Sequence, residues 1–102
     1  MGNLTANLQC GSSEKYKKDI IQYNYDALNL INDSVIYSYK YKDDELGASN
    51  RYGLIIEREC PKEIICDSKM SINIYSMTSL AWKAIQELSV KVKDLEEKLN
   101  ER

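Results

Sequence analysis

The fold of this chain is decided by its C-terminal stretch, residues 77–101, which reads MTSLAWKAIQELSVKVKDLEEKLNE. Neither glycine nor proline interrupts this stretch, and apolar residues recur in it at alternating steps of four and three. Such spacing is typical of a helix with a coiled-coil seam. The seam positions are Ile85, Leu88, Val92, Leu95 and Leu99. We therefore expect a helix over about 77–101, capped by Ser76 or Thr78, that joins identical chains in a parallel bundle.

The alternative is an amphipathic helix that packs only on its own domain, because a seam of about three heptads is short for a coiled coil. Three apolar residues, Leu80, Trp82 and Val90, lie off the seam. We expect these three side chains to dock the start of the helix against a sheet.

Upstream of the helix, the apolar pattern changes to the two-residue period of strands. Residues 35–41 place a valine and three tyrosines at every second position. The segment 43–50 contains Gly47 and predicts a turn, and residues 52–56 predict the return strand of a hairpin. We interpret the tyrosine stripe as one face of a sheet or a trimer contact, in preference to a surface that stacks on a base or sugar.

Shorter elements complete the expected fold. Residues 27–31 present a short helical face after an extended piece at 20–25, and residues 4–8 and 70–74 alternate as short strands. The single proline, Pro61, interrupts regular structure. The predicted class is α+β: a small antiparallel sheet or hairpin with a short helix and a long C-terminal helix that forms a parallel trimeric coiled coil.

Composition excludes several classes of function. The formal net charge of -2 comes from 14 basic and 16 acidic residues spread along the 102-residue chain, so we expect no nucleic-acid partner. No apolar run approaches the roughly 18 residues of a membrane span, so we expect no membrane partner. Three cysteines without metal-type spacing, in a chain that lacks histidine, argue against a metal site. We expect no cofactor.

The candidate site lies in residues 11–20, GSSEKYKKDI. The absence of histidine excludes Ser-His-Asp and Cys-His schemes, but a lysine amine can also activate a serine, and Ser12 and Lys17 stand five positions apart. Lysine is ordinarily protonated at neutral pH, so Lys17 acts as a base only where burial or nearby positive charge favours the neutral amine. Lys15 and Lys18 are neighbours of the right sign.

Three segments carry a resemblance to a known family. Residues 12–20 are similar to the pattern Ser-Ser-x-Arg-Tyr-Lys-x-Asn-Ile, and residues 52–57 to Gly-Phe/Leu-Ile-Ala-Glu/Gln. Residues 74–88 are similar to Leu-Tyr-x-x-x-x-Leu-x-Trp-Lys-Ala-Ile-Gln-Glu-Leu. In this order the segments resemble the phage-type intramolecular chaperone domains, the self-cleaving S74 peptidases, which stand at the C-termini of tail spikes, fibres and neck appendages. The resemblance covers residues 12–102.

The resemblance implies a homotrimeric domain that guides the upstream β-rich fibre segment of the same polypeptide into a trimer and then cuts itself off. On this basis Ser12 is the nucleophile, Lys17 is the general base, and the cut bond is Gly11–Ser12. Residues 1–11 would be the end of the fibre segment, and residues 12–102 the chaperone. Processing would take place in the host cytoplasm during virion assembly, with the domain released from the virion or retained in it.

Three alternatives stay open. The pair Ser13 and Lys18 has the same spacing, although the pair of Ser12 keeps Tyr16 and Ile20 at the apolar positions of the pattern. The domain could also be a clamp that trimerises a fibre, or contacts its receptor, without cutting. A third possibility is a coiled-coil interaction module unrelated to fibres.

Overall fold

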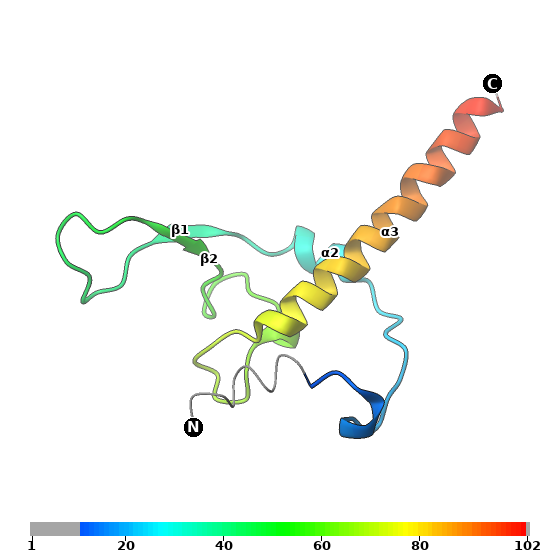
Figure 1. The fold of residues 1–102 in the computed structure, drawn as a ribbon. Coiled ribbons are helices and arrows are strands. Elements are labelled where there is room, and N and C mark those ends of the chain that lie inside the picture. The colour runs from blue at the N-terminus through cyan, green and yellow to red at the C-terminus, as the bar shows by residue number, and fades with distance from the viewer. Residues whose placement is uncertain (1–10, 102) are drawn as a thin grey trace.

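A computed structural model describes residues 11–101 of the chain. The fold is α+β, as expected, and Figure 1 shows its elements in order. These elements are the 3-10 turn η1 (Glu14–Tyr16), helix α2 (Ala27–Asn32), strands β1 (Tyr37–Tyr39) and β2 (Arg51–Gly53), the 3-10 turn η2 (Lys62–Ile64) and helix α3 (Ile74–Asn100). The strand expected over residues 4–8, and all but Gly11 of the predicted segment 1–11, lie outside the described residues.

The long C-terminal helix is confirmed, but it begins earlier than predicted. Asn73 is its N-cap, and the side-chain Oδ1 of Asn73 accepts a 3.0 Å hydrogen bond from the backbone N–H of Ser76. This bond satisfies one of the amide groups that a helix start leaves without an intrahelical partner. The prediction that Ser76 or Thr78 caps the helix is therefore wrong, since both residues lie inside α3.

The strand expected over residues 70–74 does not form. Ile72 makes only an isolated antiparallel bridge with Ile65, and Ile74 is already the first residue of α3. The cap at Asn73 explains the difference, because it commits the next residues to a helix after a single bridge. The extended piece at residues 20–25 forms no regular element.

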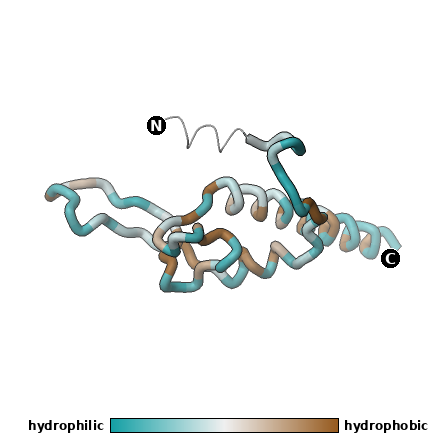
Figure 2. The backbone as a smooth tube through the Cα atoms, turned by 90° about the horizontal axis from the view of Figure 1, so that it is seen from below, coloured by the Kyte–Doolittle hydropathy of each residue, from teal (hydrophilic) through white to brown (hydrophobic). Residues whose placement is uncertain are grey.

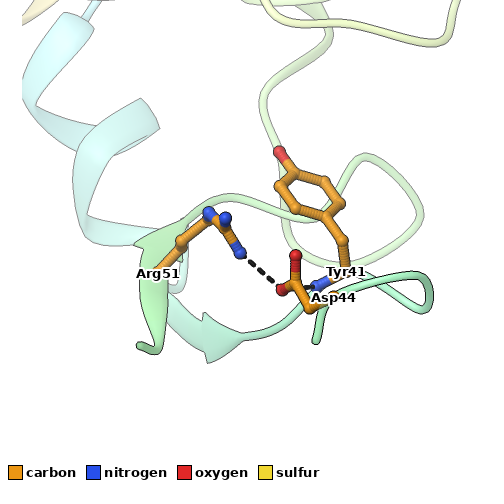
Figure 3. A network of polar contacts seen from close by, with 3 residues as sticks. All are labelled: Tyr41, Asp44 and Arg51. Carbon is orange, nitrogen blue, oxygen red and sulfur yellow. Dashed lines mark hydrogen bonds and ion pairs between the residues drawn. The ribbon is translucent and has the colours of Figure 1, made fainter. Parts of the chain in front are cut away.

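The predicted hairpin is confirmed, with strands shorter than expected. β1 and β2 pair antiparallel, with Tyr37 opposite Gly53. Beyond β1, the backbone N–H of Tyr41 donates a 2.8 Å hydrogen bond to the carboxylate of Asp44, which also pairs with Arg51 (Figure 3). Because the side chain of Asp44 takes this amide, Tyr41 is not part of the strand ladder.

Helix α2 packs against α3 and forms as predicted. Asp26 caps it, with Oδ1 of Asp26 accepting a 3.0 Å hydrogen bond from the N–H of Asn29. Two further amides at its start donate to the carboxylate of Glu87 in α3, the N–H of Ala27 at 3.2 Å and that of Leu28 at 2.9 Å. One side chain of α3 thus completes the cap of α2.

The core of the described chain is small. Its buried apolar side chains are Ala27, Ile64 and Ala84, one each from α2, η2 and α3. Helix α3 packs mainly against α2 and η2, whereas the expected packing of its start against the hairpin is at most slight. Trp82 and Val90 are 68% and 60% exposed, so the prediction that they dock the helix on a sheet is wrong; Leu80 is half-buried.

The chain is extended for its length. Its radius of gyration is 18.0 Å, whereas a compact domain of this size has about 13 Å. Its accessible surface is 9262 Å², whereas a compact monomer of 11.8 kDa exposes about 5,900 Å². The hairpin and the second half of α3 project away from the centre in opposite directions (Figure 1), and hydrophobic residues gather around the centre (Figure 2). No helix within residues 11–101 is long and apolar enough to cross a membrane.

Candidate active site

The 3-10 turn η1 folds the candidate site back on itself. Ser13 caps the turn, with its Oγ accepting a 3.4 Å hydrogen bond from the N–H of Lys15. Two backbone bonds close the turn, from Tyr16 N–H to the Ser13 carbonyl at 3.0 Å and from Lys17 N–H to the Glu14 carbonyl at 3.1 Å. Residues on either side of such a turn lie close together, because each bond spans three positions.

The turn brings Ser12 and Lys17 into contact. The Nζ of Lys17 lies 2.9 Å from the Oγ of Ser12 and donates a hydrogen bond to it. This is the distance at which a base takes a proton from a hydroxyl nucleophile. The alternative pair is not arranged this way: among the described residues Ser13 Oγ accepts from the N–H of Lys15, and no hydrogen bond joins it to Lys18.

Tyr75 is the third residue of the site, and the sequence analysis missed its role. Its hydroxyl is hydrogen-bonded to the Oγ of Ser12 at 2.9 Å, and its ring centroid lies 5.9 Å from the Nζ of Lys17. Tyr75 is the second residue of α3 and is 63 positions from Ser12. The only sequence signal was its place in the segment 74–88, which says nothing about contact with Ser12.

The chain around the site is open to solvent. Ser12, Lys17 and Tyr75 are all exposed, and Gly11 is half-buried. The Nζ of Lys15 lies 5.1 Å from the centroid of the Tyr16 ring, so its charge is held against an aromatic face. Across residues 11–101, no group of three or more His, Cys, Asp or Glu side chains is placed to hold a metal ion.

Asp19 sets the direction in which the chain leaves the site. Its φ is 54°, in the left-handed region that asparagine and aspartate enter more readily than most residues. This conformation gives a physical reason why Asp19 stands where the pattern of residues 12–20 has asparagine.

One known protein family has a model that matches the segment with the Ser12–Lys17 pair. The model of a family described as Peptidase_S74, chaperone of endosialidase, matches residues 12–58. Residues 12–58 are therefore similar to the Peptidase_S74 family. The match confirms the family that the sequence motifs indicated, and it begins at Ser12, the residue predicted as the nucleophile. Searches among curated proteins and among solved structures found no match to this chain.

The Peptidase_S74 match covers the Ser12–Lys17 pair and the hairpin, which together are slightly less than half of the chain. Residues 74–88 lie beyond it, so their similarity to the closing motif of the family stays a prediction. Tyr75 therefore links the matched part of the chain to helix α3, which the match does not reach.

The predicted coiled-coil seam lies on the exposed part of α3, beyond the residues that the family model matches. Its five side chains are between 47% and 66% exposed. These residues are Ile85, Leu88, Val92, Leu95 and Leu99. The apolar face is available to a partner helix, and its association into a parallel trimer stays a prediction.

Proposed function

We propose that residues 12–102 are an intramolecular chaperone that trimerises an upstream fibre segment of the same polypeptide and then cuts the Gly11–Ser12 bond. Ser12 is the nucleophile and Lys17 is the base. The observation that carries the proposal is the 2.9 Å hydrogen bond between Lys17 Nζ and Ser12 Oγ, in a segment matched by the Peptidase_S74 family. The description of that family as a chaperone of endosialidase supports the chaperone role.

The reaction is an N-to-O acyl shift followed by hydrolysis. The Oγ of Ser12 attacks the carbonyl carbon of Gly11 while its proton passes to the neutral amine of Lys17. The C–N bond between Gly11 and Ser12 then breaks, and the nitrogen of Ser12 takes the proton back from Lys17. Water hydrolyses the resulting ester, which gives a carboxylate on Gly11 and restores the hydroxyl of Ser12, whose amine was already freed when the C–N bond broke.

Association between chains would bury surface that the single chain leaves exposed. The chain exposes about half as much surface again as a compact monomer of its mass, and the seam of α3 is part of that surface. Permanent oligomers bury areas of this order, between about 2,000 and 5,000 Å². A trimer would also take Lys17 out of water, which favours its neutral form, so cleavage would follow assembly.

Denaturing intact mass on the chain joined to its natural upstream segment tests the proposal. We expect the wild type to give a fragment that begins at Ser12, while Ser12→Ala and Lys17→Ala stay whole. Lys18→Ala is the matched control and should still be cut. A fragment that begins at Ser13 would move the pair by one position.

Light scattering on the same samples separates assembly from cutting. We expect a trimer both for the wild type and for the uncut Ser12→Ala variant. An uncut wild type that still forms a trimer would leave a chaperone or clamp without peptidase activity, and a monomeric Ser12→Ala variant would contradict the trimer.

A further inference from the structure

Tyr75 occupies a position that the proposed reaction does not yet use. Its hydroxyl lies 2.9 Å from the oxygen that would attack, and its ring lies 5.9 Å from the amine that would act as base. It contacts both members of the pair, although it comes from a different part of the chain. Its side chain is 48% exposed and does not belong to the buried core.

The hydrogen bonds of Ser12 show what this position can do. A serine hydroxyl has one proton to donate and two lone pairs to accept with. For Lys17 to act as a base, the proton of Ser12 has to point at Lys17 Nζ, and a second acceptor near Ser12 Oγ would compete for that proton. The phenol of Tyr75 removes this competition when it donates its own proton to Ser12 Oγ.

We propose that Tyr75 is a positioning residue for self-cleavage, whose phenol donates to Ser12 Oγ and so directs the serine proton to Lys17. The inference rests on the proposed function. While Oγ gives up its proton to Lys17, the donated hydrogen bond stabilises the partial negative charge on Oγ, until the bond to the carbonyl carbon of Gly11 forms. The proton of Ser12 moves to Lys17 and then to the nitrogen of Ser12. Tyr75 keeps its own proton throughout.

The ring of Tyr75 has a separate role from its hydroxyl. Proton transfer turns the amine of Lys17 into an ammonium, and aromatic faces attract ammonium groups within about 6 Å of the ring centroid. At 5.9 Å this attraction is near its limit, so we expect the hydroxyl to matter more than the ring. The two roles can be separated, since Tyr75→Phe removes only the hydroxyl and Tyr75→Leu removes both.

The experiment measures the rate of the single cut at several pH values, in the chain joined to its natural upstream segment. The rate is expressed per assembled chain, from light scattering and denaturing mass on the same samples. We expect Tyr75→Phe to lower the plateau rate by about 10- to 100-fold, the effect of one hydrogen bond to a charged group. Tyr75→Leu should be slower still, and both variants should assemble as the wild type does.

Tyr25→Phe is the matched control, because Tyr25 is 74% exposed and outside the contacts of Ser12 and Lys17; it should be cut at the wild-type rate. If Tyr75→Phe is cut as fast as the wild type, the inference is overturned and the proposed function stands. The inference would also be overturned if Tyr75→Leu were cut slowly and Tyr75→Phe at the wild-type rate. In that case the ring of Tyr75 would matter and its hydroxyl would not. If the wild type itself is never cut, the proposed self-cleavage fails, and the role of Tyr75 with it.

Discussion

The carboxylate of Glu87 accepts a 2.9 Å hydrogen bond from the backbone N–H of Leu28, at the start of α2. It also accepts one from the neighbouring N–H of Ala27. A helix start has amides without intrahelical partners and a partial positive charge, so a carboxylate there is favourable on both counts. Glu87 therefore holds α2 against α3 through the backbone of α2.

Removal of this carboxylate should loosen the contact between the two helices. We expect Glu87→Ala to lower the free energy of unfolding by about 1–3 kcal/mol, the cost of leaving partly buried amides without a partner. Urea unfolding followed by circular dichroism measures the change. Glu97→Ala, on the exposed part of α3, is the control, and an equal loss there would mean that the contact with α2 contributes nothing.

The loop of the hairpin should be sensitive to acid. The backbone N–H of Tyr41, together with Arg51, lowers the pKa of Asp44 below its ordinary value of 3.8. A lowered pKa in the folded state means that Asp44 stabilises the loop above the pKa of the unfolded chain, and that this contribution is lost as pH falls through the folded value. An NMR titration of the Asp44 carboxyl should therefore show a midpoint below 3.8. A midpoint at or above that value in the folded chain would contradict the contact with Tyr41.

The start of α3 depends on Asn73. We expect Asn73→Ala to cost about 1 kcal/mol of stability, because the bond from Oδ1 to the N–H of Ser76 is lost. Asn73→Ser should restore most of the loss, since serine is also a good cap. Hydrogen exchange at Ser76 follows the first turn directly. Unchanged protection of that amide in Asn73→Ala would show that another group caps the helix.

Any side chain at Gly47, in the loop of the hairpin, should lower the stability of the hairpin. Gly47 has φ +87°, a conformation that residues with a Cβ rarely adopt, although no atom lies within 4 Å of where a Cβ would stand. We expect Gly47→Ala to destabilise the hairpin by about 1 kcal/mol through backbone strain alone. Gly47→Asn should cost less, because asparagine enters this region more readily. Thermal unfolding of the three chains gives the order, and equal stabilities would contradict a strained turn.

Assembly and cutting should fail together when the seam is broken. We expect the double change of Leu88→Asp with Leu95→Asp to give an uncut monomer, because charge on the seam prevents the helices from packing. Light scattering and denaturing mass measure the two effects on one sample. Glu96→Gln, next to the seam, is the control and should still assemble and be cut. Efficient cutting by a proven monomer would refute the dependence of cleavage on assembly.

The local parts of this fold could be predicted from the sequence, and the distant contacts could not. The hairpin and α2 follow from apolar spacing, which depends on neighbours within a few residues. The helix start was misplaced because Asn73, Ser76 and Thr78 are all suitable caps, and the bridge between Ile65 and Ile72 that precedes Asn73 is not visible in the sequence. The expected packing of Trp82 and Val90 was wrong, because the apolar character of a residue does not determine which surface covers its side chain.

In the candidate site, too, the contact between residues near in sequence could be predicted and the distant contact could not. Ser12 and Lys17 are close in sequence, and a family pattern singles them out, so their pairing was expected before the structure was described. Tyr75 had no such signal, because its contact with Ser12 joins residues 63 positions apart. The hydrogen bond of Glu87 to α2 was missed for the same reason.

The separation of Ser12 and Tyr75 along the chain also sets an interval between the synthesis of the two residues. A ribosome adds roughly 5–20 residues per second, so the 63 positions between them correspond to roughly 3–13 seconds of synthesis. During that interval Ser12 and Lys17 already exist, while the residue that contacts both of them has not been made. Any segment on the N-terminal side of Ser12 would thus be fully synthesised before the Gly11–Ser12 bond could be cut at its full rate.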